Sequence, residues 1–127
     1  IHNMEKRTMI RILFVDDDTD YLRVLSYAFM KDFEVSTASG VREAMKFLNE
    51  KTVDMVCSDL HMHGEKGTDL QWEMKQSGMD IPFVLMSGDS DSMEIEIAKS
   101  RGATFVPKDW NMVNQIKQIA ESIKSKA

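Results

Sequence analysis

Cysteine, proline and long apolar runs are all scarce in this sequence. Its 127 residues include one cysteine and two prolines. A single cysteine cannot build a disulfide framework, which excludes the small disulfide-rich class of secreted domains. No apolar run approaches the roughly 20 residues that a membrane span needs, and the chain opens without a secretory signal pattern. We therefore expect a cytoplasmic domain with no membrane contact, in which Cys57 is an inert buried thiol.

The composition is that of one globular domain. Hydrophobic residues make up 43% of the chain and charged residues 29%, enough apolar surface for a single core. The net charge of -5 and the isoelectric point near 5.2 argue against direct binding of nucleic acid. Residues 1–3, which precede Met4, are interpreted as an artificial addition. The domain is predicted to span residues 9–124, without repeats or linkers.

Apolar runs that resemble strands alternate along the chain with stretches of helical spacing. The runs cover residues 10–15, 33–37, 53–58, 82–87 and 103–108. Thr19 and Asp109 are predicted N-caps of the first and last helices, a fourth helix is predicted over 90–101, and residues 64–67 are predicted to form a loop. Because parallel strands need crossover helices, this alternation predicts an α/β fold: a doubly wound, five-stranded parallel sheet with helices on both faces.

Charged or hydroxyl-bearing residues stand where the predicted strands end. Asp16 and Asp17 follow the first strand, Asp59 the third, Ser87 the fourth and Lys108 the fifth. Each alone has an ordinary explanation as a loop acid, a turn hydroxyl or a solvated lysine. Together they meet at one edge, where three crowded carboxylates need a cation. Oxygen ligands favour Mg²⁺, and a hydroxyl with an ammonium group suits a phosphoryl group.

These residues, in order and spacing, resemble the receiver domain of two-component response regulators. The resemblance covers nearly all of residues 9–124, and it implies a flavodoxin-like (βα)5 fold. It rests on the stretches FVDDD (14–18), DLHM (59–62) with Gly67 beyond it, LMSG (85–88) and GATFVPK (102–108). The joint pattern is far more specific than any one of its parts.

The resemblance implies a role for each of these residues. Asp59 would accept a phosphoryl group from the phosphohistidine of a sensor histidine kinase or phosphotransfer protein. Mg²⁺ or Mn²⁺ would be held by Asp16, Asp17, Asp59 and the backbone carbonyl of His61. Lys108 would bind the phosphoryl group, while Ser87 and Phe105 would form the switch.

The implied activity is signalling rather than turnover of a metabolite. Phosphorylation would shift the surface formed by the fourth and fifth helices and the last strand, which an output domain or target protein would read. A phosphorylation-dependent dimer through this surface is a further expectation from the resemblance.

The sequence departs from the family pattern at two positions. His63 stands where a proline is usual, and the order Pro107-Lys108-Asp109 lacks the usual proline after the lysine, so we expect a different backbone over 108–110. His61 and Asp89 occupy positions that tune dephosphorylation in the family.

Several aromatic and histidine side chains keep two interpretations. Trp110 is read as core or partner surface, and Trp72 as packing or a surface aromatic. A zinc site at His61 and His63 is conceivable, but solvated loop histidines are the simpler interpretation.

Three alternative functions fit the sequence less well. A phosphohydrolase of the haloacid dehalogenase type places an aspartate nucleophile after its first strand, but Asp20 stands where its motif needs Thr or Val, and the chain is too short for a cap domain. A flavodoxin-like cofactor binder would meet repulsion between three acids and a flavin phosphate. A receiver-like binding module that is not phosphorylated remains the main alternative.

Overall fold

A parallel five-stranded sheet forms the centre of the molecule, in a computed structural model that describes residues 9–89 and 92–126. Residues 1–3 lie outside this described part. The strands of the sheet are β1 (Arg11–Val15), β2 (Glu34–Ala38), β3 (Met55–Asp59), β6 (Phe83–Ser87) and β7 (Thr104–Pro107). They lie in the order β2-β1-β3-β6-β7. Because the chain moves outward from β1 to β2 and then returns to β3, the topological switch point lies between β1 and β3, where such sheets bind ligands.

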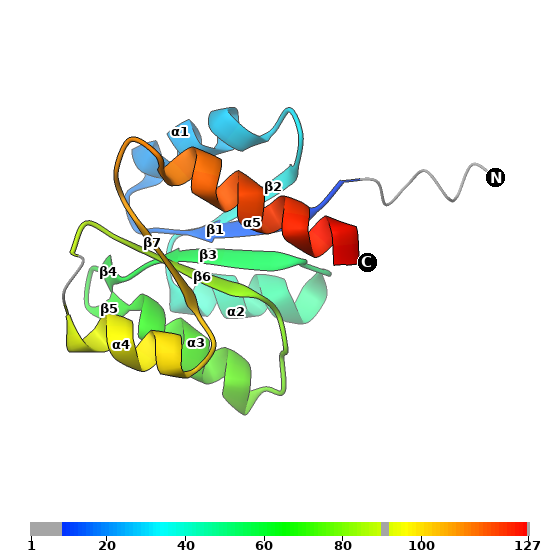
Figure 1. The fold of residues 1–127 in the computed structure, drawn as a ribbon. Coiled ribbons are helices and arrows are strands. Elements are labelled where there is room, and N and C mark those ends of the chain that lie inside the picture. The colour runs from blue at the N-terminus through cyan, green and yellow to red at the C-terminus, as the bar shows by residue number, and fades with distance from the viewer. Residues whose placement is uncertain (1–8, 90–91, 127) are drawn as a thin grey trace.

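Helices cover both faces of the sheet (Figure 1). The helices are α1 (Thr19–Phe29), α2 (Val41–Glu50), α3 (Gly67–Gln76), α4 (Met93–Ser100) and α5 (Met112–Lys126). In Figure 1, α1 and α5 lie on one face, and α2, α3 and α4 lie on the other. The predicted doubly wound α/β fold is confirmed. No helix in the described part combines the length and the hydropathy needed to cross a bilayer.

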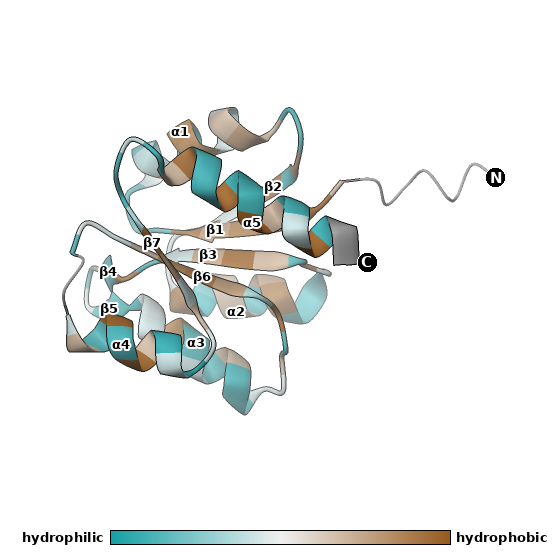
Figure 2. Ribbon diagram, in the orientation of Figure 1, coloured by the Kyte–Doolittle hydropathy of each residue, from teal (hydrophilic) through white to brown (hydrophobic). Residues whose placement is uncertain are grey.

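Alternate residues of the central strands enter two separate cores. In β1, Ile12 and Phe14 pack with α1 and α5, whereas Leu13 and Val15 pack with α2, α3 and α4. In Figure 2 the central strands are mostly hydrophobic, whereas the helices carry hydrophilic and hydrophobic residues in turn. Each large apolar side chain buried in this way contributes about 2 kcal/mol. The two-sided burial explains why these strands read as continuous apolar runs rather than alternating ones.

Helix starts differ in detail from the sequence-based expectations. Asp18, rather than Thr19, caps α1, and its carboxylate accepts the backbone N–H of Tyr21. The fourth helix begins at Met93 with Ser92 as its cap, later than the predicted start at residue 90, which lies outside the described residues. Asp109 accepts the N–H of Asn111 at 2.9 Å, in a turn that precedes α5 instead of capping its first residue. Short polar side chains cap equally well at adjacent positions, so the pattern leaves the choice open.

The predicted loop over residues 64–67 contains part of a short antiparallel hairpin. Its strands are β4 (His61–Met62) and β5 (Glu65–Lys66), and Gly64 at the turn has a φ of 77°. Glu65 accepts the N–H of Val41 at the start of α2, and Lys66 pairs with Glu94 on α4. These contacts fix the hairpin beside the carboxyl end of β3.

Candidate functional site

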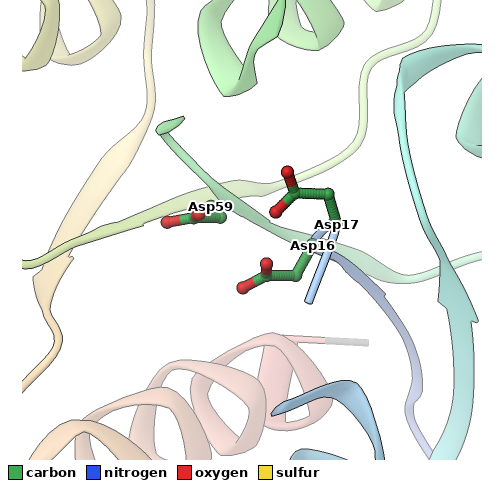
Figure 3. Close-up of side chains that lie close together, drawn as sticks. All are labelled: Asp16, Asp17 and Asp59. Carbon is green, nitrogen blue, oxygen red and sulfur yellow. The ribbon is translucent and has the colours of Figure 1, made fainter. Parts of the chain in front are cut away.

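Three carboxylates meet where β1 and β3 end (Figure 3). Asp16 and Asp17 directly follow β1, and Asp59 is the last residue of β3. One carboxylate oxygen from each lies within 4.8 Å of the others. The N–H of Asp16 donates to the Ala38 carbonyl at 3.1 Å, which holds the end of β1 against the end of β2. The cluster therefore sits at the topological switch point of the sheet.

Burial differs sharply within this cluster. Asp16 is 1% exposed and Asp59 is 7% exposed, whereas Asp17 faces solvent. Burial raises the pKa of Asp16 above its ordinary range, although the N–H of Asp18 and the charge of Lys108 act in the opposite direction. A buried carboxylate beside two others needs positive charge to remain ionised at neutral pH.

Lys108 brings a positive charge into the cluster. Its Nζ lies 3.0 Å from Oδ1 of Asp59 and 3.4 Å from Oδ2 of Asp16. Burial lowers the pKa of Lys108, but the hydrogen bond to Asp59 and the charges of Asp59 and Asp16 outweigh it, so the pKa is raised overall. The lysine follows β7, and its backbone N–H donates to the Ser87 carbonyl at 2.9 Å. This bond fixes the base of the lysine side chain to the neighbouring strand.

Ser87 and Phe105 lie on the adjacent strands β6 and β7. Ser87 is 1% exposed, and its hydroxyl accepts the N–H of Asp89 at 3.0 Å. Phe105 is partly buried against the core beneath α2, α3 and α4, and it pairs in register with Leu85, two residues before Ser87. The two side chains are thus carried by strands whose relative position is fixed.

The two histidines of the β4–β5 segment border the cluster. The N–H of His63 donates to Oδ2 of Asp17, and Nε2 of His61 lies 3.5 Å from Oδ2 of Asp89. Both histidine side chains are exposed. Within the described part of the chain, the one grouping of three side chains able to ligate a metal contains the aspartates and neither histidine.

The loop after Lys108 depends on the residue that stands at position 109. The N–H of Asp109 donates to the Pro107 carbonyl at 2.9 Å, a bond that a proline at this position would lack.

Trp110 is 90% exposed, so it is not a core residue. Trp72 is 50% exposed, and the guanidinium of Arg101 lies 5.3 Å from its ring centroid, which makes it a surface aromatic. Cys57 is fully buried, and burial raises the pKa of its thiol, as expected for an inert packed cysteine.

Two residues next to the site were not assigned a structural role from the sequence. Gly67 opens α3 where it passes the end of β3, and a Cβ at this position would lie 2.4 Å from the Asp59 carbonyl oxygen. The ring of Tyr21 on α1 lies beneath the Lys108 ammonium, with 4.7 Å between Nζ and the ring centroid. Gly67 belongs to the family pattern, but its spacing alone does not reveal the close approach.

We expect Gly67→Ala to lower the free energy of unfolding by about 1–3 kcal/mol, because the added methyl group would overlap a backbone oxygen and Leu85. Urea denaturation measures the change. Gly88→Ala is the matched control, since a Cβ at Gly88 meets no atom within 4 Å and should change stability little. Equal stability of the two variants would contradict the close approach at Gly67.

The three carboxylates fit a magnesium ion. They supply oxygen donors only, which hard divalent cations prefer, and the exposed side of Asp17 leaves room for the water molecules that Mg²⁺ retains. The negative charge of three carboxylates against one lysine also favours a bound cation.

Comparison with known proteins gives a consistent result. The sequence model of the response regulator receiver domain matches residues 12–121. The two-component response regulator ARR14 of Arabidopsis thaliana is 33% identical over 97 residues, covering 74% of this chain and 25% of that protein. The response regulator SaeR of Staphylococcus aureus is 28% identical over 105 residues, covering 81% of this chain and 46% of SaeR. This chain spans less than half the length of these curated relatives.

Solved structures share the fold. The response regulator TrrA of Thermotoga maritima, crystallised in complex with Mg²⁺–BeF, superposes with a TM-score of 0.79 at 24% identity, covering 91% of this chain and 99% of that one. A receiver domain protein from Methanospirillum hungatei gives a TM-score of 0.78 at 22% identity, with 92% and 95% covered. Like this chain, these are α/β proteins with the same arrangement of strands and helices.

Proposed function

The chain belongs to the response regulator receiver family, and we propose that Asp59 is the residue through which it accepts a phosphoryl group in a two-component phosphorelay. The single observation that carries this assignment is that Asp59 contacts the Lys108 ammonium at 3.0 Å and lies in one cluster with the other two carboxylates. Nucleophile, cation and metal ligands are thereby within reach of one transferred group.

Asp59 provides the nucleophile for the transfer. One of its carboxylate oxygens attacks phosphorus in line as the bond from phosphorus to the donor's imidazole nitrogen breaks, and the bonding electrons leave with the imidazole. The product on this chain is an acyl phosphate. Before transfer, the Lys108 ammonium contacts Oδ1 of Asp59. After transfer it can instead form an ion pair with an oxygen of the phosphoryl group, where negative charge accumulates.

Asp16, Asp17, Asp59 and the backbone carbonyl of His61 are the proposed ligands of Mg²⁺, with Mn²⁺ as a substitute. When bound, the cation neutralises the charge that builds up on phosphoryl oxygens. Asp16 and Asp17 would hold the cation from the end of β1. Because Asp16 is buried, water is excluded from one side of the site.

Ser87 and Phe105 are the proposed switch residues. After transfer, the Ser87 hydroxyl would exchange its bond from the Asp89 N–H for one to the phosphoryl group, and the partly buried Phe105 would move into the space vacated. The added charge shifts the equilibrium between two conformations of the surface made by α4, β7 and α5. Dimerisation through that surface on phosphorylation stays a prediction.

The domain is regulatory, and its own chemistry is limited to phosphoryl transfer onto Asp59 and the later hydrolysis. We assign it residues 9–124. Its proposed donor is a sensor histidine kinase or phosphotransfer protein in the cytoplasm, and its proposed reader is an output domain or a target protein. Support comes from the relatives, which are named as two-component response regulators.

Intact-mass measurement after incubation with acetyl phosphate tests the proposed function. We expect one phosphoryl adduct that forms with Mg²⁺ and disappears when the metal is chelated. Absence of an adduct at short quench times, in protein shown to be folded, would favour a receiver-like module that binds partners without being phosphorylated.

Magnesium should also stabilise the folded protein in the absence of any phosphodonor. At a Mg²⁺ concentration ten times its dissociation constant, the free energy of unfolding should rise by about 1.4 kcal/mol, as measured by urea denaturation. Asp17→Asn should weaken this gain, because it removes the exposed ligand of the cluster. Asp20→Asn is the control, since Asp20 lies on α1 and pairs with Arg23. An equal gain in all three proteins would exclude the cluster as the metal site.

A further inference from the structure

The ammonium group of Lys108 lies over the aromatic ring of Tyr21 on α1. The ammonium lies 4.7 Å from the centroid of the Tyr21 ring while Asp59 and Asp16 contact it at 3.0 and 3.4 Å. An ammonium within about 6 Å of an aromatic face is attracted by the electrons of the ring. Lys108 therefore has two kinds of anchor: carboxylates, which take part in the proposed chemistry, and a ring, which does not.

The ring is itself held in place at both ends. Tyr21 lies in the first turns of α1 and packs against the core between α1 and α5. Its hydroxyl donates to Sδ of Met112, the first residue of α5, at 3.4 Å. Burial raises the pKa of Tyr21, so the phenol remains neutral and keeps its proton for this bond. The ring thus bridges α1 and the start of α5, across the loop that carries Lys108.

The backbone next to Lys108 gives the contact between the lysine and the Tyr21 ring a larger part in positioning the ammonium. The loop has Asp109 in place of the proline expected from the family pattern, so the lysine lacks that rigid neighbour. Transfer of a phosphoryl group onto Asp59 would also convert one carboxylate anchor of the lysine into an acyl phosphate. The contact with the Tyr21 ring differs from these, because the ring belongs to α1 and carries no reacting oxygen.

We propose that Tyr21 is a positioning residue that holds the Lys108 ammonium toward the reacting group through its ring face. The inference rests on the proposed role of Lys108 in phosphoryl transfer. The ring acts through the lysine, so its effect must vanish when the lysine is absent.

A double-mutant cycle tests this dependence, with the rate of adduct formation from acetyl phosphate in Mg²⁺ as the readout. Tyr21→Leu, which removes the ring but fills much of its volume, should slow adduct formation about fivefold. Tyr21→Phe keeps the ring and should remain within about twofold of the unmodified chain. In Lys108→Ala, the further change Tyr21→Leu should have no additional effect. Trp72→Leu is the matched control, because it removes a ring beneath Arg101 and should leave the rate unchanged.

The outcomes separate the inference from the function on which it rests. Equal slowing by Tyr21→Leu with and without Lys108, or failure of Tyr21→Phe to preserve the rate, would make Tyr21 a packing residue and overturn the inference alone. A wild-type chain that forms no adduct would overturn the proposed function and the inference with it. Upfield ring-current shifts of the Lys108 side-chain protons, lost in Tyr21→Leu and kept in Tyr21→Phe, are a second expected result. Their absence in the wild type would also overturn the inference.

Discussion

Asp59→Asn should abolish phosphorylation of this chain by acetyl phosphate in Mg²⁺. The amide has nearly the shape of the carboxylate, but it is a poor nucleophile and cannot form the acyl phosphate. The adduct seen by intact mass should fall to the background of the reaction without phosphodonor. This is the largest effect we expect from any single substitution, because it removes the reacting atom itself.

Asp54→Asn provides a matched control for this loss. Asp54 precedes β3 and accepts the N–H of Arg11 at 2.8 Å, at the opposite end of the strand from Asp59. The same change of chemical group there should leave the adduct intact. An adduct of undiminished yield in Asp59→Asn would mean that another group accepts the phosphoryl, and the assignment of Asp59 would be wrong.

Lys108→Ala should slow formation of the phosphoryl adduct about 100-fold, and the adduct that does form should still be on Asp59. The ammonium is the only cation whose ion pairs among the described residues reach both Asp16 and Asp59. Removing one preorganised electrostatic contact from a reaction that develops charge on oxygen typically costs a factor of about 10²–10³. The effect should be in the rate of transfer, measured by quenching the acetyl phosphate reaction at successive times.

Two further lysine variants define what the site needs. Lys99→Ala removes an exposed ammonium that pairs with Glu96 on α4, and it should leave the rate unchanged. Lys108→Arg keeps the charge but replaces a compact head group with a larger planar one, so we expect partial activity. A wild-type rate in Lys108→Ala would contradict the proposed contact between the lysine and the transferred group.

Much of the fold follows from the sequence because the strands of a parallel sheet are buried on both faces. Phe14 and Leu13 are both fully buried, on opposite sides of β1, so the strand reads as one apolar run. The β4–β5 hairpin was missed because its strands have two residues each. Contacts such as that of Glu65 with Val41 stabilise the hairpin, and no local pattern predicts them.

The acidic cluster was predictable for a topological reason, whereas the contact between Tyr21 and Lys108 beside it was not. Parallel strands bring Asp16 and Asp59 to one edge whatever the details of packing. Tyr21 and Lys108 are far apart in sequence, and their contact depends on how α1 and the loop after β7 pack. A tyrosine on the apolar side of a helix carries no signal that a lysine will lie against its ring.

The most direct test of Asp59 as the phospho-acceptor is to locate the phosphoryl group after reaction with acetyl phosphate and Mg²⁺. Borohydride reduces an acyl phosphate to an alcohol, which converts the modified aspartate to homoserine, and peptide mass spectrometry then identifies the position. We expect reduction at Asp59 and at no other aspartate. Reduction at Asp16 or Asp17, or an adduct that resists borohydride, would contradict this assignment.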